Sequence, residues 1–140
     1  MDDELRRRVW SRARDRCEYC RFSASLGELP FEIDHVVARK HGGGTEESNL
    51  ALSCFYCNSY KGPNIAGLDP QTSSVVRLFH PRRDVWARHY RWVRAVLEGT
   101  TGIGRATIEV LRINHPDALA VRQALFEEGA DFLPPTFSLS

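Results

Sequence analysis

The sequence has no apolar run that approaches the ~20 residues needed to cross a bilayer as a helix. Its first residues, Met1-Asp2-Asp3-Glu4, are acidic, whereas a secretory signal peptide starts with basic residues. We therefore expect a cytoplasmic protein with no membrane partner. An excess of charge is also missing, because 19 Lys and Arg stand against 18 Asp and Glu. A formal charge of +1 gives no overall attraction to nucleic acid, so such contact would need local basic patches.

Lysine is scarce, with two lysines among the 19 basic residues. Arginines gather in two stretches, 6–16 and 77–94, each of which holds six arginines and one aspartate. Guanidinium groups pair with phosphate through two parallel hydrogen bonds. Arg12, Arg82 and Arg83 are therefore candidates for nucleic-acid contact. The same pattern also fits the solvated outer face of elements whose apolar sides are packed.

The chain is short, with 140 residues, of which 42% are hydrophobic. A domain of this size buries about 68% of the surface that its unfolded chain exposes, so it can fold without disulfides. We expect one α+β domain over residues 1–140. In this interpretation an N-terminal helix and a core occupy residues 1–62, and an α/β extension with frayed last residues occupies 63–140.

Cysteine is limited to four residues, which form two Cys-x-x-Cys pairs: Cys17 with Cys20, and Cys54 with Cys57. Thiols stay reduced in a cytoplasmic protein, which argues against a disulfide framework. A redox pair is disfavoured because the motif occurs twice and neither copy lies in a βαβ pattern. Two such pairs supply the four thiolates of a structural Zn²⁺ site. Two unrelated pairs of buried cysteines remain the alternative.

The 33 residues between the two pairs are more than a plain zinc ribbon contains. Their pattern predicts a strand over 31–37, a glycine-rich loop over 41–45 and a second strand over 49–53. Ser53 can cap a following helix that ends at Gly62-Pro63. Helical spacing would place three residues on one stripe of that helix: Cys54, Asn58 and Lys61.

These residues resemble the motif of the HNH nucleases. The resemblance rests on the two Cys-x-x-Cys pairs and on four further elements: Asp34-His35, Gly42-Gly43, Asn49-Leu50 and Asn58-x-x-Lys61-Gly62. It covers about residues 17–62 and implies a ββα-metal core clamped by zinc. It also implies a metal-dependent endonuclease that hydrolyses phosphodiester bonds in DNA.

The resemblance further implies roles for single residues. His35 would be the general base that activates water, and Asn49 would brace the loop. Asp34 and Asn58 would hold a catalytic cation, Mg²⁺ or Mn²⁺, and Lys61 would direct its charge toward a phosphate. The residue types suit this chemistry, because neutral imidazole accepts a proton from water near pH 7 and a divalent cation offsets charge on the phosphate.

Two positions depart from the pattern of the family. Many members have His where this chain has Asn58, and a proline often stands in place of Ala38. An amide oxygen still binds hard cations such as Mg²⁺, so the first change alters metal preference before it removes activity. The alternative function is a catalytically silent zinc module that binds nucleic acid or protein. Such a module needs only the cysteines and the basic faces.

The sequence is less informative after Pro63. Residues 64–74 are expected to form a linker and 75–79 a strand. The aromatic stretch 86–92 favours a strand over a short helix, and its interleaved arginines fit either a nucleic-acid clamp or the charged face of a packed element. Thr101 can cap a helix, and a last helix would begin near residue 115 and close at Gly129.

Overall fold

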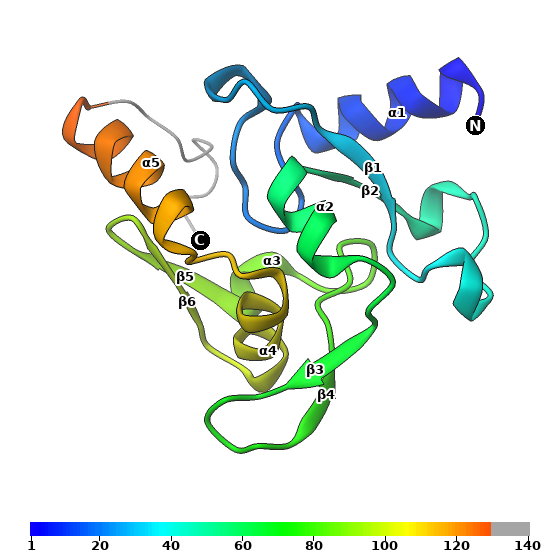
Figure 1. Ribbon diagram of the computed structural model, residues 1–140. Coiled ribbons are helices and arrows are strands. Elements are labelled where there is room, and N and C mark those ends of the chain that lie inside the picture. The colour runs from blue at the N-terminus through cyan, green and yellow to red at the C-terminus, as the bar shows by residue number, and fades with distance from the viewer. Residues whose placement is uncertain (130–140) are drawn as a thin grey trace.

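The computed structural model describes residues 1–129, which mix helices and strands as expected for an α+β protein (Figure 1). The helices are α1 (Asp3–Ala13), α2 (Phe55–Lys61), α3 (Trp86–His89), α4 (Gly102–Leu111) and α5 (Pro116–Glu127). The strands are β1 (Glu32–His35), β2 (Leu50–Ser53), β3 (Ala66–Leu68), β4 (Val75–Arg77), β5 (Tyr90–Val93) and β6 (Val96–Gly99). Three short 3₁₀ turns are η1 (Ala24–Leu26), η2 (Arg39–His41) and η3 (Glu47–Asn49). None of the helices in residues 1–129 is long and apolar enough to cross a membrane.

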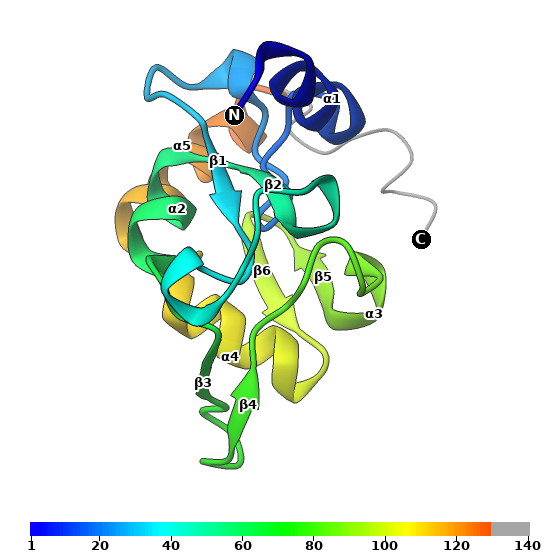
Figure 2. The same cartoon turned by 90° about the vertical axis from the view of Figure 1, so that its right-hand side faces the viewer.

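The strands of the described part form three antiparallel hairpins, β1–β2, β3–β4 and β5–β6. In the first hairpin Asp34 lies opposite Ala51, and His35 lies opposite Leu50. Helix α1 packs on β2 and helix α2 on β1, while α4 contacts α2, β3 and β6. Both views place the β3–β4 hairpin at the end of the molecule opposite α1 (Figures 1 and 2). The ββα unit formed by β1, β2 and α2 therefore lies between α1 and the C-terminal part.

Helix α1 follows the expected pattern. The Asp2 side chain caps it by accepting a hydrogen bond from the amide of Leu5 at 2.7 Å. Val9 and Ala13 are buried against β2, whereas most of the arginines on the helix are exposed. The helix ends at Ala13, and the next residue, Arg14, forms its C-cap in the left-handed conformation.

Helix α2 begins one residue later than the sequence pattern predicts. Its N-cap is Cys54, whose sulfur accepts a hydrogen bond from the amide of Cys57, and the predicted cap at Ser53 is therefore wrong. Ser53 belongs to β2, and its fully buried hydroxyl donates to the carbonyl of Cys54. The sulfur of Cys54 thus caps the helix and is also the first sulfur of the second cysteine pair.

The C-terminal half departs from expectation at two places. The predicted linker contains strand β3, and a Cβ atom on its central Gly67 would lie 2.4 Å from Val110 of α4. At Gly67 the strand packs on α4 through its backbone, so this contact adds no hydrophobic side chain that the sequence could reveal. The aromatic stretch is divided between α3 and β5, so a single strand over 86–92 is wrong. Thr101 caps α4 as predicted, whereas residues 134–140, which we expect to be frayed, lie outside the described residues.

The largest cluster of buried side chains joins the two halves of the chain. It contains the four cysteines together with residues of the C-terminal half: Leu78, Phe79, Trp86, Tyr90, Leu97, Leu111 and Ile113. The indole nitrogen of Trp86 donates to the carbonyl of Tyr19 at 2.9 Å, which ties α3 to the first cysteine pair. The aromatic residues of this stretch thus serve the core, and Trp86 is not available to stack on a base.

Helix α5 is attached mainly through one charged side chain. Arg122 is 4% exposed, and it is the one residue of this helix that is buried. Its guanidinium donates to the carbonyls of Ala95 and Ile113 and to the amide oxygen of Asn114, at 2.8 to 3.0 Å. Asn114 in turn pairs with both backbone groups of Leu97. Arg122 therefore joins α5 to the β5–β6 hairpin and to the end of α4.

We predict that Arg122→Met lowers the free energy of unfolding by about 2 to 3 kcal/mol, because three buried acceptors lose a charged donor. Urea denaturation followed by tryptophan fluorescence measures the change. Gln123→Met is the matched control, since Gln123 makes its side-chain hydrogen bond with the exposed Glu127 one turn away. Equal midpoints for wild type and Arg122→Met would show that α5 does not depend on this side chain.

Candidate active site and metal centres

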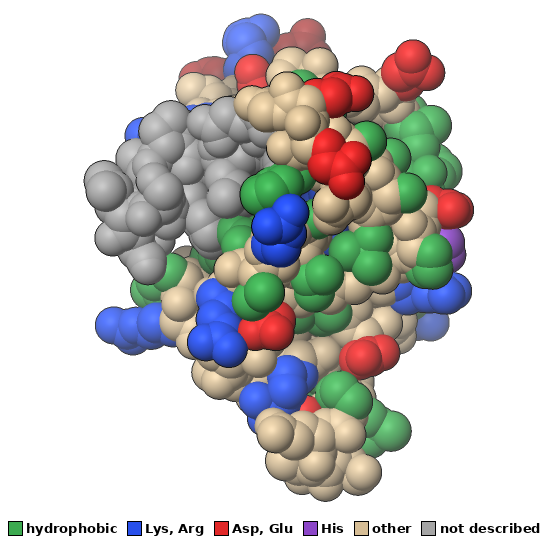
Figure 3. Space-filling model, turned by 90° about the vertical axis from the view of Figure 1, so that its left-hand side faces the viewer, with side chains coloured by type: hydrophobic (Ala, Val, Ile, Leu, Met, Phe, Trp, Pro, Cys, Tyr) green, Lys and Arg blue, Asp and Glu red, His purple; other side chains and the backbone are tan. Residues whose placement is uncertain are grey.

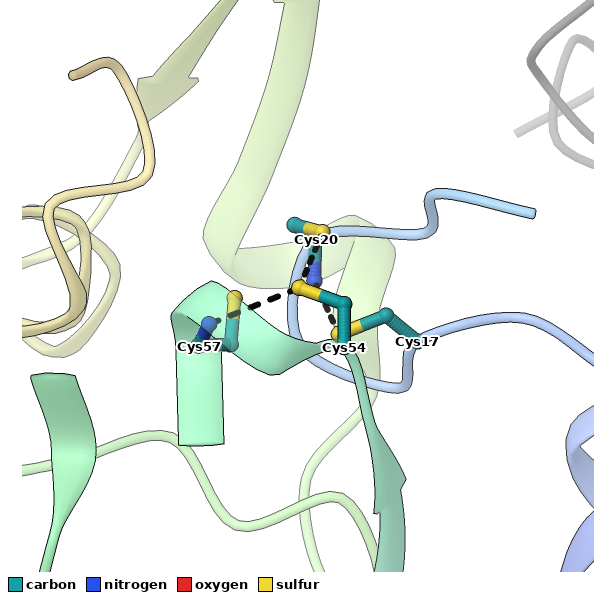
Figure 4. Close-up of side chains that lie close together, drawn as sticks. All are labelled: Cys17, Cys20, Cys54 and Cys57. Carbon is teal, nitrogen blue, oxygen red and sulfur yellow. Dashed lines mark hydrogen bonds between the residues drawn. The ribbon is translucent and has the colours of Figure 1, made fainter. Parts of the chain in front are cut away.

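The four cysteines meet in one buried cluster although 33 residues separate the two pairs (Figure 4). All four sulfur atoms lie within 4.8 Å of one another, and none forms a disulfide. In each pair the amide of the second cysteine donates to the sulfur of the first at 3.4 Å. The prediction that the two pairs come together is thus confirmed, and two unrelated pairs are excluded.

This cluster fits a structural zinc ion. Four thiolates around Zn²⁺ at about 2.3 Å place neighbouring sulfurs about 3.8 Å apart in a tetrahedron. The sulfurs of Cys20 and Cys54, one from each pair, are 3.8 Å apart. The guanidinium of Arg21 lies beside the cluster, and it would offset part of the negative charge of four thiolates. All four positions would be filled by protein, so this centre would hold the fold and leave no place for a substrate.

A second group of side chains lines an open cleft beside α2. The cleft has a volume of about 270 Å³ and is formed by β1, the turn that follows it and the end of α2. The predicted residues Asp34, His35 and Asn58 all line it, together with Arg39 and Lys40. A carboxylate and an amide oxygen are the ligands that hard divalent cations prefer. The donor chemistry of Asp34 and Asn58 therefore suits Mg²⁺ or Mn²⁺.

The ring of His35 is held by the glycine-rich loop. Its Nε2 atom lies 2.9 Å from the hydroxyl oxygen of Thr45. Asn49 fixes this loop, because its amide accepts from the amide of Val37 and donates to the carbonyls of Val37 and Gly44, each at 2.9 Å. Asn49 therefore acts on His35 indirectly, by fixing the loop that carries Thr45.

Asp34 is buried and is held by two donors. The hydroxyl of Tyr19 donates to Oδ2 at 2.6 Å, and the ammonium of Lys61 lies 3.0 Å from the same oxygen. Asp34 is 6% exposed and Lys61 is 1% exposed. Burial raises the pKa of Asp34 above its ordinary value, while the Lys61 ammonium and the Tyr19 hydroxyl oppose that rise. Lys61 also donates to the carbonyl of His35 at 3.2 Å, which joins both cleft residues to α2.

Three of the residues predicted to contact phosphate have other partners. Lys61 is buried on Asp34, so it does not face a phosphate as expected. Arg12 donates to the carbonyls of Glu47 and Leu50, and Arg82 forms an ion pair with the buried Glu18. The Arg12 guanidinium joins α1 to the start of β2, and the Arg82 guanidinium joins the segment after β4 to the first cysteine pair.

Arg83 is the predicted contact residue that remains exposed. The sequence analysis missed four residues that the structure places at or behind the cleft: Tyr19, Arg39, Lys40 and Thr45. Arg39 and Lys40 follow the Asp-His pair closely, which is the signal that could have identified them. No comparable signal links Tyr19 to Asp34, because the contact depends on the folded position of the first cysteine pair.

Another cavity lies on the other side of α2, next to the cysteine cluster. It has a volume of about 190 Å³, and apolar side chains such as Leu29, Phe55, Tyr56 and Val121 line it. Hydrophobic side chains lie side by side on the face of the molecule shown in Figure 3. None of the cleft residues lines this cavity, so it plays no part in the site described above.

The zinc centre leads to a prediction about stability. We expect one zinc per chain by elemental analysis, and Cys54→Ser should lose the metal and leave the ββα unit unfolded or molten. Thiolate–zinc binding is worth on the order of 10 kcal/mol, which is comparable to the stability of a whole domain. Ser59→Ala, on the exposed side of α2, is the control. A metal-free wild type whose cooperative melt is unchanged by Cys54→Ser would refute the zinc centre.

Comparison with known protein families identifies the segment that contains the cysteine cluster and the cleft. Residues 17–64 match the family described as HNH endonuclease. No curated protein and no solved structure matches the chain. Domains of this family are generally nuclease domains that act on nucleic acid, although some are not catalytic. The matched segment contains both cysteine pairs, the β1–β2 hairpin and α2. The chain therefore carries an HNH domain over residues 17–64, with a four-cysteine cluster that fits zinc.

Proposed function

We propose that the protein is a metal-dependent endonuclease that hydrolyses phosphodiester bonds in DNA, with His35 as the general base. The observation that carries the proposal is the shared cleft, in which a histidine, a carboxylate and an amide come together from β1 and α2. The match to the HNH family supports the same chemistry.

The orientation of His35 suits a general base. Its Nε2 atom is engaged by Thr45, and no hydrogen bond to Nδ1 is found within residues 1–129. When Nε2 carries the proton and donates it to the Thr45 hydroxyl, Nδ1 carries the lone pair. Nδ1 can then take a proton from a water molecule that attacks phosphorus. Asn49 and Thr45 are positioning residues in this scheme.

Asp34 and Asn58 would hold the catalytic cation, Mg²⁺ or Mn²⁺. When bound, such a cation supplies charge that stabilises the scissile phosphate and the leaving oxygen. Asp34 lies on β1 next to the base, and Asn58 lies one turn before the end of α2. The two proposed ligands therefore come from separate elements, which the cysteine cluster holds next to each other.

Arg39 and Lys40 take the place that the sequence analysis gave to Lys61. Both are exposed, both line the cleft, and neither forms an ion pair with a described residue. Positive side chains at the mouth of a cleft draw a phosphate backbone toward it. We assign them to contact with the DNA strand that enters the cleft, together with the exposed Arg83.

A specific observation also favours the alternative function, a silent zinc module that binds nucleic acid or protein. The Asp34 carboxylate already has a buried cationic partner in Lys61. A carboxylate that is satisfied in this way can serve the fold alone. The two functions differ in whether His35 affects a reaction rate.

We expect His35→Ala to lower the cleavage rate roughly 100- to 10,000-fold while zinc content and DNA affinity stay close to wild type, because only proton transfer is lost. Supercoiled plasmid, incubated with a panel of divalent cations with and without chelator, gives the rate. The control is His41→Ala, which removes an exposed histidine from the turn that follows β1. Equal cleavage by wild type and His35→Ala, or no cleavage by either across the panel, would favour the silent module.

A separate prediction concerns the salt dependence of DNA binding. Removing one phosphate contact lowers the slope of log affinity against log salt by about 0.9. We expect this change for Arg39→Ala and for Lys40→Ala, with the loss of affinity shared by all DNA sequences. Arg91→Ala is the control, because Arg91 pairs with Glu98 in the β5–β6 hairpin and does not line the cleft. An unchanged slope in both cleft variants would contradict the assignment.

A further inference from the structure

The hydroxyl of Tyr19 is the closest hydrogen-bond partner of the Asp34 carboxylate in the structure. We propose that Tyr19 is a positioning residue that holds Asp34 in the orientation in which it binds the catalytic cation, a role that rests on the function proposed above. Tyr19 is fully buried and lies between the two cysteines of the first pair. It therefore joins the zinc centre to the cleft through one side chain.

The two oxygens of Asp34 are used unequally. Oδ2 accepts from Tyr19 at 2.6 Å and lies 3.0 Å from the Lys61 ammonium, whereas Oδ1 has its contact with Lys61 at 3.4 Å. Two short contacts occupy Oδ2, and they fix the plane of the carboxylate. Oδ1 is thus the oxygen that keeps capacity for a cation, and Asp34 lines the cleft where that cation would bind.

The backbone that carries Tyr19 is held by hydrogen bonds at Tyr19 itself and at the preceding Glu18. The carbonyl of Tyr19 accepts from the indole of Trp86 at 2.9 Å, and the amide of Glu18 donates to Leu52 of β2 at 2.8 Å. The carboxylate of Glu18 accepts from the amide of Leu52. The segment that carries Tyr19 is therefore fixed to β2, the strand that pairs with the strand of Asp34, and the buried Tyr19 hydroxyl reaches Asp34 from this segment.

The two residues that donate to Asp34 lie next to different cysteine pairs in the chain. Tyr19 lies within the first pair, and Lys61 follows Cys57 by one helical turn on α2. The cysteine cluster thus sets both contacts of the carboxylate. Partners that orient a metal ligand in this way typically change metal affinity about 10- to 100-fold when they are removed.

The test is the affinity of zinc-loaded protein for Mn²⁺, measured from the electron paramagnetic resonance signal of free Mn²⁺. We expect Tyr19→Phe to bind Mn²⁺ about 10- to 100-fold more weakly than wild type, with one zinc per chain retained. In plasmid cleavage, the Mn²⁺ concentration for half-maximal rate should rise by the same factor, while the rate at saturating Mn²⁺ approaches that of wild type. A role confined to stability would not separate these two kinetic quantities.

Tyr56→Phe is the matched control, because it removes one hydroxyl from an exposed tyrosine on α2. If Tyr19→Phe folds and binds Mn²⁺ as tightly as wild type, the proposed role of Tyr19 is wrong. The proposed function is not affected by that outcome. If wild type binds no Mn²⁺, or binds it with the same affinity as Asp34→Ala, the cation site and the role of Tyr19 are both wrong.

A second measurement needs no substitution at Tyr19. Wild type labelled with 3-fluorotyrosine has four ¹⁹F signals, and single Phe variants at the other three tyrosines assign the signal of Tyr19. Saturation with Mg²⁺ should shift this signal, because a cation on Asp34 weakens the hydrogen bond from the phenol. A Tyr19 signal that does not move, under conditions in which Mg²⁺ supports cleavage, would overturn the proposal.

Discussion

The convergence of four cysteine sulfurs in one buried cluster is the constraint on which the rest of the structure depends. Two of the sulfurs precede β1 and two surround the start of α2, so the cluster fixes the hairpin and the helix relative to each other. The short elements of the ββα unit have little propensity to form alone, since β1 and β2 have four residues each and α2 has seven. Their arrangement is therefore set by packing around the cluster and by the metal that the cluster fits.

The positions of the cleft residues depend on how the hairpin and α2 are held against each other. Asp34 and His35 are adjacent on β1, and Lys61 of α2 contacts both, the first through its carboxylate and the second through its backbone carbonyl. A buried ion pair of this kind seldom adds net stability, because desolvation of the two charges offsets their attraction. Its effect here is geometric: it fixes the end of α2, and with it Asn58, against the strand that carries the candidate base. The Asn49 contacts do the same for the loop that carries Thr45.

Much of this arrangement could be predicted from the sequence because its signals are local. Cysteine spacing, the Asp-His pair and the apolar period of Val9 and Ala13 in α1 all depend on neighbours within a few residues. The errors arose where a long-range contact decides the outcome. Lys61 and Asp34 are 27 residues apart, and Arg82 and Glu18 are 64 apart, so no spacing rule shows that these cations are already paired. Strand β3 was missed because its central residue, Gly67, packs against α4 through the backbone and therefore gives no hydrophobic signal.

The order in which the cysteines occur in the chain has a consequence for biosynthesis. The first pair leaves the ribosome 33 residues before the second, which takes about 2 to 7 s at typical rates of translation. During that interval the nascent chain offers two thiolates without the partners that complete a tetrahedral shell. A half-formed shell would bind zinc weakly and exchange it readily, so a zinc ion in this cluster would have all four ligands only after Cys57 has emerged. Folding of the ββα unit around such an ion would therefore wait for the last of the four ligands to be synthesised.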